Sequence, residues 1–184
     1  MGQKYVINEN GEIIRGDYFA TTVKEEKPQP LPFNRKAWIM ILLNVVTLGI
    51  YGYIVWFAMG KETNITCCKD GKHTQGFWAT LGLSIITLGI YFIVWVIKWM
   101  NRESDFLQMR KEPVIITGGM YISIIILEVI ISCVLQCYNM LVISYIVSLA
   151  ISFFLIFLVI KKHNRVNEIY NMEQFPQNIK EIKK

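Results

Sequence analysis

The stretch Thr47-Leu48-Gly49-Ile50-Tyr51 recurs letter for letter as Thr87-Leu88-Gly89-Ile90-Tyr91, 40 residues further along the chain. Each copy lies inside a long apolar run, and the likeness continues outward in the same register, with Trp38 matching Trp78. Self-similarity at a fixed spacing is the mark of a duplicated structural unit. We therefore treat residues 37–105 as one duplicated unit, with Thr47, Gly49, Tyr51, Thr87, Gly89 and Tyr91 as its repeat motif.

Four windows of the chain are almost free of charge. They contain no Lys or Arg and a single acid, Glu128. A run of about 18 or more such residues is long enough to cross the hydrocarbon core of a membrane as a helix, whereas surface helices of soluble proteins keep a charged face. The sequence therefore predicts an all-α integral membrane protein with four hydrophobic helical segments, at residues 37–59, 76–97, 114–136 and 140–160.

The polar stretches divide the chain into parts. Two short β-prone runs flank Asn10-Gly11, which predicts a β-hairpin, and a proline-containing linker follows it. The third and fourth apolar segments are joined only by Cys137-Tyr138-Asn139, so we expect them to form an antiparallel helical hairpin. The predicted parts are a polar N-terminal segment (1–36), the duplicated unit (37–105), the transmembrane hairpin (106–160) and a basic C-terminal tail (161–184).

The basic residues predict the orientation. The chain has 19 Lys and Arg against 14 Asp and Glu, and cytoplasmic segments of membrane proteins are enriched in Lys and Arg. If all four segments cross, the first loop on the far side holds only Lys61, Lys69 and Lys72, and the other basic residues share the side of both termini. We therefore expect a multi-pass protein of the cytoplasmic membrane with cytoplasmic termini. The lipid bilayer is its expected partner, and nucleic acid is not.

The glycines at the centre of each copy leave an alternative open. If the chain breaks near Gly49 and Gly89, each repeat becomes a hairpin that enters and leaves the membrane on one face. Each arm of about ten residues would then reach about 15 Å, half of the core. All basic residues would lie on the cytoplasmic side, and only the last two segments would cross. The charge pattern favours this arrangement, but the uninterrupted hydrophobicity favours four spans, which is our prediction.

Polar residues recur in the two repeats at helical spacing. Offsets of three and four place them on one helix face, and such faces pair helices within lipid. We expect the two repeats to pack together through Asn44, Thr47 and Tyr51 and through Ser84, Thr87 and Tyr91. The tryptophans beside the lysines at the polar ends are typical interfacial anchors, although a ligand cage is the alternative. We predict Trp56, Trp95 and Trp99 as anchors.

Glu128 is the one ionisable side chain inside the apolar windows. An acid within lipid is costly and therefore suggests proton or cation handling; the alternative is a protonated carboxyl that hydrogen-bonds a serine. Ser132 and Gln136 follow it at intervals of four, and three serines share that interval in the fourth segment. We expect the two stripes to face each other, forming a candidate intramembrane polar site of Glu128, Ser132, Gln136, Ser144, Ser148 and Ser152.

Catalytic and metal-binding patterns do not occur in the sequence. It contains no HExxH, no GxSxG and no phosphate-binding glycine loop. The four cysteines, Cys67, Cys68, Cys133 and Cys137, have neither disulfide-framework nor zinc-finger spacing. We therefore expect no enzyme, no cofactor and no metal site.

The paired T-L-G-I-Y runs, with downstream tryptophan and a charged tail containing asparagine, resemble a bacterial membrane family known as domain-of-unknown-function family 4234, over about residues 35–105. The resemblance implies membrane residence and carries no catalytic or ligand residues. Some family members have an N-terminal zinc ribbon, and this chain has no cysteine before Cys67. We hypothesise a non-enzymatic interaction, accessory or immunity-type protein that binds a membrane-protein partner or forms a homo-oligomer. The alternative is a small oligomeric channel or transporter element that uses Glu128 and the serine-lined path.

Overall fold

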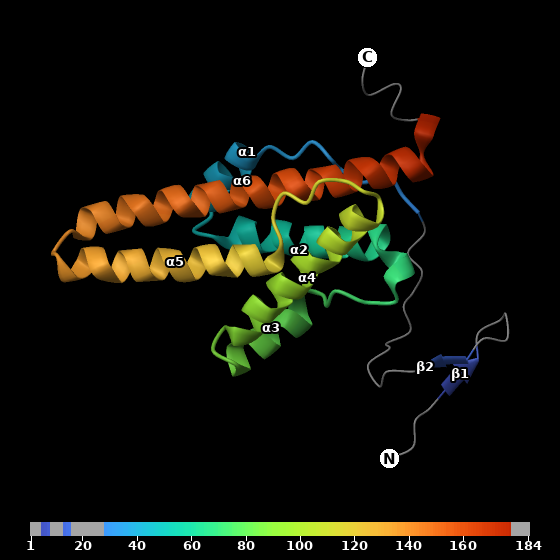
Figure 1. The fold of residues 1–184 in the computed structure, drawn as a ribbon, viewed down its shortest axis with the longest axis horizontal. Coiled ribbons are helices and arrows are strands. Elements are labelled where there is room, and N and C mark those ends of the chain that lie inside the picture. Colours follow the sequence, from blue (N-terminus) through green and yellow to red (C-terminus); the bar gives the residue numbers. More distant parts are fainter. Residues whose placement is uncertain (1–4, 8–12, 16–27, 178–184) are drawn as a thin grey trace.

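The protein is helical in its main body (Figure 1). The computed structural model describes residues 5–7, 13–15 and 28–177. Two short strands precede the helices, β1 (Tyr5–Ile7) and β2 (Ile13–Arg15), and they pair antiparallel with Tyr5 opposite Arg15, as the Asn-Gly turn predicted. The helices are α1 (Ala37–Val46), α2 (Ile50–Thr66), α3 (Phe77–Ile86), α4 (Ile90–Met109), α5 (Gly118–Cys137) and α6 (Leu141–Gln174), with a 3₁₀ turn at Cys68–Asp70.

Both copies of the repeated stretch break the helix in the same way. Leu48 and Gly49 have φ of 50° and 94°, and Leu88 and Gly89 have φ of 50° and 88°. These left-handed values cost an L-residue about 1–2 kcal/mol, but they cost glycine little. The chain reverses at each copy, so α1–α2 and α3–α4 are helical hairpins. The prediction that the first two apolar segments are continuous spanning helices is therefore wrong, because the four segments form six helices.

The threonine of each copy explains why the break is stable. Thr47 Oγ1 donates to Leu43 O (2.7 Å) and accepts from Tyr51 N (2.9 Å), and Thr87 Oγ1 makes the same pair of bonds at 2.8 and 2.9 Å. The hydroxyl thus satisfies a carbonyl at the end of one helix and an amide at the start of the next. We expected these threonine hydroxyls to pair the two repeats with each other. They instead form hydrogen bonds within each hairpin.

Asn44 adds a second clamp in the first hairpin only. Its side-chain oxygen accepts from Gly52 N (2.9 Å). The backbone bond from Gly49 N to Asn44 O (2.7 Å), by contrast, recurs in the second hairpin from Gly89 N to Ser84 O (2.7 Å). Because a Cβ on Gly52 would lie 2.5 Å from that side-chain oxygen, glycine is required for this approach. Ser84 occupies the equivalent position of the second hairpin, and its hydroxyl has no hydrogen-bond partner among the described residues.

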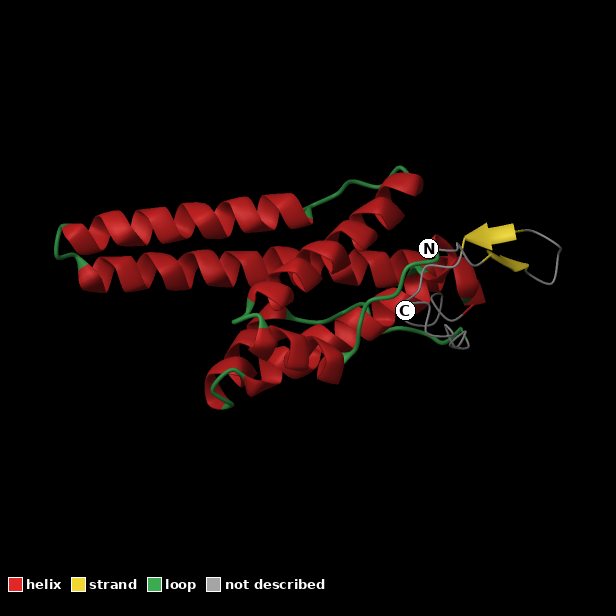
Figure 2. Cartoon of the chain, turned by 90° about the horizontal axis from the view of Figure 1, so that it is seen from below, coloured by secondary structure: helices red, strands yellow, loops and turns green. Residues whose placement is uncertain are grey.

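Three helical hairpins therefore lie side by side. Figure 1 shows their turns facing the same side, with the α5–α6 turn reaching furthest, and Figure 2 shows α5 and α6 projecting together beyond the other helices. The main apolar core lies where α2, α4, α5 and α6 meet, around Phe57, Trp95, Trp99, Ile116 and Val159. The polar second half of α6 continues along α2 and α4 past this core.

Two helices, α5 and α6, are long and apolar enough to cross a membrane. A helix of this hydrophobicity in a soluble protein is normally buried. Here only 6% of the most apolar window of α5 and 22% of that of α6 are buried inside the protein. The tight turn between them, at Tyr138–Met140, agrees with the antiparallel hairpin that the sequence predicted. The apolar part of α6 is residues 141–160, and its charged part begins at Lys161.

Candidate functional site: a buried ion-pair network and a cationic pocket

The predicted polar stripes of α5 and α6 do face each other. The hydroxyls of Ser132 and Ser148 lie 3.0 Å apart and are hydrogen-bonded. Glu128 and Ser152 line one cavity of about 370 Å³ that also borders the first helical hairpin. Ser144 is buried, whereas Gln136 is exposed. The structure thus brings the expected residues together in part, around a carboxyl that has no hydrogen bond or ion pair with the described residues.

The tryptophans expected at the membrane surface lie mostly inside the protein. Trp95 is 4% exposed and Trp99 is 0% exposed. Trp99 Nε1 donates to Thr63 Oγ1 at 2.7 Å, and Trp56 is half-buried against the Trp99 ring. The prediction of interfacial anchors is therefore wrong for Trp95 and Trp99, because these rings fill the space between α2 and α4.

A buried histidine between two carboxylates is the main feature that the sequence did not reveal. His163 on α6 places Nδ1 2.6 Å from Glu103 Oε1 on α4 and Nε2 2.9 Å from Glu62 Oε2 on α2. His163 is 0% exposed and Glu103 is 1% exposed. Both ring nitrogens face carboxylate oxygens, so both act as donors, which requires the protonated imidazolium.

Two further cations complete the network. Arg35, in the segment before α1, pairs with Glu62 through both ends of its guanidinium, with Nη1 2.7 Å from Oε2. Lys162 is fully buried beside His163, and its Nζ donates to Ser104 Oγ (3.0 Å) and to the Met100 carbonyl. That Nζ also lies 3.9 Å from Glu103 Oε2. The network therefore sets one buried carboxylate, Glu103, and one partly buried carboxylate, Glu62, against three cations, one from the segment before α1 and two from α6.

The directions of the pKa shifts indicate that Glu62, Glu103 and His163 stabilise one another's charged forms. Burial alone would raise the pKa of Glu62, but hydrogen bonds from His163 and Arg35 outweigh it and lower the pKa to about 2. Burial also opposes ionisation of Glu103, yet the charge of His163 keeps that pKa below its usual range. Burial would lower the pKa of His163, and the charge of Glu103 raises it instead. The pKa of Lys162 is lowered, chiefly by burial.

This arrangement suits a structural latch better than a reaction centre. The network joins α2, α4, α6 and the segment before α1, and its central pair is closed to solvent. A buried charge that loses its partner is strongly destabilising, so the helices are held in one arrangement as long as the charges persist.

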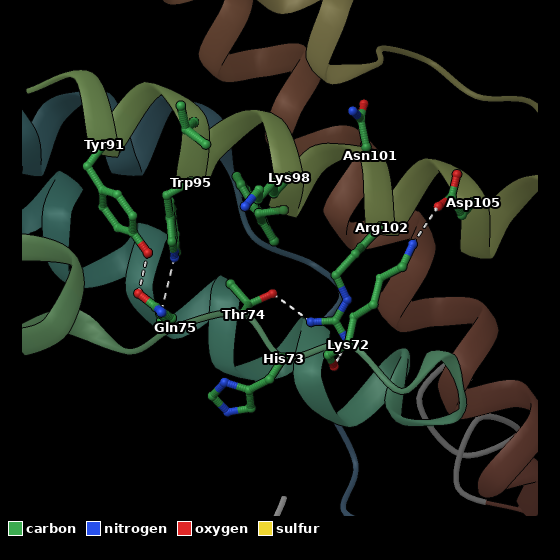
Figure 3. A pocket seen from close by; sticks show the side chains of 12 residues that line it. Lys72, His73, Thr74, Gln75, Tyr91, Trp95, Lys98, Asn101, Arg102 and Asp105 are labelled. Atoms are coloured by element: carbon green, nitrogen blue, oxygen red, sulfur yellow. Dashed lines mark hydrogen bonds and ion pairs between the residues drawn. The ribbon is translucent and has the colours of Figure 1, made fainter. Parts of the chain in front are cut away.

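A second polar feature is a pocket of about 660 Å³ between α4 and the loop after α2 (Figure 3). Figure 3 shows Tyr91 and Trp95 pointing from α4 toward Gln75 of that loop. Tyr91 hydrogen-bonds the Gln75 side chain, and Trp95 Nε1 donates to Gln75 O at 3.0 Å. The charged lining residues are Lys72, Lys98, Arg102 and Asp105.

Arg102 builds the wall of this pocket. Its guanidinium donates to both oxygens of Asp70 (2.7 and 2.9 Å). It also donates to Asn64 Oδ1 and Thr74 Oγ1, both at 2.7 Å, and to Lys72 O at 2.8 Å. These bonds fix the whole loop against α4. Arg102 is 5% exposed, so its charge is already committed inside the protein.

Comparison with known families identifies the first half of the duplicated unit. The sequence profile of DUF4234, a domain of unknown function, matches residues 35–77. The similarity to DUF4234 is therefore limited to this segment. The match confirms the family expected from the sequence and covers α1, α2 and the loop with Asp70, but it ends as α3 begins. No curated protein and no solved structure matches the chain.

One signal in the sequence could have revealed the latch. His163, Asn167 and Asn171 recur at intervals of four, and all three are buried on one face of α6. Asn171 exchanges hydrogen bonds with the backbone of Leu31 at 2.9 and 2.6 Å, so this face holds the segment that leads into the DUF4234 domain. A polar stripe directly after an apolar helix indicates a buried partner, but the identity of that partner depends on the fold.

Proposed function

We propose that this chain is a cell-membrane protein anchored by α5 and the apolar part of α6, with its DUF4234 hairpin and second hairpin entering from the cytoplasmic side without crossing. The distribution of charge supports this arrangement. Within residues 28–177, every Lys and Arg lies outside the four apolar segments (37–59, 76–97, 114–136 and 140–160) and therefore away from the three helical turns. A membrane placed over the apolar parts would leave all of them on one side, as the preference for cytoplasmic basic residues requires.

The helix lengths also support it. The 20 residues of α5 span about 30 Å, which matches the hydrocarbon core, whereas α1 and α3, with ten residues each, span about 15 Å. The turns of the two shorter hairpins would then lie near the bilayer centre. Leu48 and Leu88 at these turns are 93% and 94% exposed, which suits contact with lipid. The Thr47 and Thr87 hydroxyls supply hydrogen bonds that backbone at that depth needs.

The molecular role that fits best is non-enzymatic interaction within the membrane, as an accessory or immunity-type protein. The observation that carries this proposal is the closed pairing of Glu62, Glu103 and His163. These groups are the natural acid–base candidates of the chain, and their contacts are used to fix helices. A rigid, charge-latched scaffold with broad apolar surfaces suits binding of a second membrane protein or a second copy of the chain.

A small channel or transporter element is the second candidate. Glu128 favours it, because its carboxyl lines a cavity with Ser152 and is not paired with the described residues. Proton or cation flux through vesicles that contain the protein would test this role. A Glu128→Gln variant with unchanged flux would exclude it.

Labelling with a membrane-impermeant maleimide tests the topology. Cys68 is exposed in the loop after α2, and Tyr138, 72% exposed, lies at the α5–α6 turn. In variants whose only cysteine is Cys68 or a Tyr138→Cys replacement, we expect Cys68 to react in inside-out vesicles and the turn cysteine in intact spheroplasts. Reaction of Cys68 in spheroplasts would contradict the proposed placement of the first two hairpins. Cross-linking and co-purification then test the interaction, and recovery of neither a partner nor an oligomer would contradict it.

A further inference from the structure

The residues of α4 that line the cationic pocket change from apolar to charged along the helix, as a phospholipid changes from acyl chain to headgroup. We propose that it binds a phosphate-bearing anion, the phosphodiester headgroup of an anionic glycerophospholipid, with the phosphate beside Lys98 and Lys72 and the acyl chains along Val94 and Tyr91. This inference rests on the proposed membrane placement, because that placement brings the charged end of α4 to the level of the headgroups.

The free positive charge of the pocket belongs to two lysines. Lys98 is exposed and its Nζ has no hydrogen bond or ion pair with the described residues. Lys72 Nζ lies 3.6 Å from Asp105 Oδ2, and both side chains are largely exposed to solvent, so this pair is weak and easily exchanged. An ammonium group is a point charge that suits phosphate oxygens. Two lysines against one carboxylate leave the pocket with a net positive charge that nothing within it neutralises.

The lining of α4 changes along the helix in one direction. Tyr91, Val94 and Trp95 come first, at the end beside the Gly89 turn, and Lys98, Asn101 and Asp105 follow toward the polar end. This order runs from apolar to charged, as a phospholipid does from acyl chain to headgroup. At about 660 Å³ the pocket falls within the range of small-molecule sites and exceeds what a single phosphate ion fills.

Hydrogen bonds within the protein hold the walls of the pocket in place. Arg102 ties the loop to α4, and Asn64 holds Thr74 from the other side, with Asn64 Nδ2 2.9 Å from Thr74 O and Thr74 N 2.7 Å from Asn64 Oδ1. The backbone that carries Lys72 is therefore fixed before binding. A site whose backbone is fixed in this way avoids part of the ordering cost that weakens binding at flexible sites.

Native mass spectrometry of the full chain in mild detergent tests the proposal. The probes are phosphatidylglycerol and phosphatidylcholine with identical acyl chains, and we expect the protein to retain phosphatidylglycerol preferentially. Each basic residue near an anionic surface contributes about 1 kcal/mol, so Lys98→Gln should reduce this preference about fivefold and Lys72→Gln/Lys98→Gln up to about 25-fold. Lys98→Arg should keep most of it, because the charge remains.

A matched pair of exposed lysines outside the pocket, Lys69→Gln/Lys161→Gln, controls for general charge. An equal loss in this control would overturn the proposal, because the preference would then reflect diffuse attraction. Displacement of the lipid by equimolar inorganic phosphate or glycerophosphoglycerol would also overturn it, in favour of a free phosphate. Protein that stays in carbonate-washed membranes but shows no preference overturns this inference alone. Protein that washes off overturns the membrane placement.

Discussion

Replacement of Glu103 by glutamine should destabilise the fold more than any exposed charge replacement. Glu103 accepts hydrogen bonds from Thr63 Oγ1 (3.0 Å) and His163 Nδ1 (2.6 Å) and lies 3.9 Å from Lys162 Nζ. The neutral amide would leave the imidazolium and the ammonium buried with less compensation. Removal of one partner from a buried ion pair costs about 3–5 kcal/mol, and we expect a loss of free energy of unfolding in that range.

The same reasoning predicts strong non-additivity with His163. His163→Gln alone should also cost about 3 kcal/mol, because Glu103 then keeps only the distant Lys162 as a buried counter-charge. Once either partner has been replaced, replacement of the other removes little further stabilisation. The double variant should therefore cost about 2–3 kcal/mol less than the sum of the two single variants, in line with coupling energies of residues in one network.

Unfolding in mixed micelles, followed by tryptophan emission, measures these differences. Trp99 is a suitable reporter, because its ring centroid lies 6.1 Å from that of His163 and its indole nitrogen bonds Thr63. Glu173→Gln is the matched control, since Glu173 forms an exposed ion pair with Arg110 and should lose less than about 1 kcal/mol. A Glu103→Gln variant as stable as this control, or additive single variants, would refute the latch.

Three further measurements test other parts of the structure. The pKa of His163 lies above its ordinary 6.5, so the stability that this residue adds is complete below pH 6.5 and is lost as the pH rises through the higher pKa. The pKa of Glu62 is lowered from 4.5 to about 2, so the stability that Glu62 adds is complete above pH 4.5 and is lost as the pH falls toward 2. A pH series of unfolding midpoints should show both losses of stability. A midpoint that does not change with pH would contradict this prediction. Gly89→Ala should cost about 1–2 kcal/mol, since φ is +88° with open space around the Cβ position, whereas Gly82→Ala inside α3 should be neutral or slightly stabilising; equal thermal midpoints would contradict this. Cys67 is buried, and burial raises its pKa to about 12, so a maleimide should modify it only after unfolding, and rapid modification of the native protein would contradict the burial.

The apolar parts of the fold were predictable because they depend on local pattern. The limits of the α5–α6 hairpin follow from uncharged windows and a three-residue connection, and the antiparallel register of the serine stripes follows from their spacing. The helix breaks at Gly49 and Gly89 were foreseen only as an alternative. Hydrophobicity does not report φ, and a continuous apolar run looks the same whether the chain continues or reverses within it.

The latch was not predictable because its members are far apart in the sequence. Glu62, Glu103 and His163 each follow an apolar run, where a charged residue normally marks the start of a solvated tail. Whether such a residue is exposed or buried depends on how far the partner helix continues. Here α6 extends to Gln174, so its polar half covers the polar ends of α2 and α4 and turns apparent surface charges into buried ones.

The duplication explains how α2 and α4 meet at the latch. Thr63 and Glu103 are equivalent positions, 40 residues apart, and they hydrogen-bond each other at 3.0 Å, so α2 and α4 meet through matching points of the two repeats. Glu62 and Arg102 are also equivalent, yet they carry opposite charges: one joins the latch, and the other fixes the loop of the cationic pocket. Two identical hairpins would place like charges at both positions, but α6 supplies only one His163. The divergence of these two positions therefore lets Glu62 pair with His163 of α6 while Arg102 holds the loop of the cationic pocket.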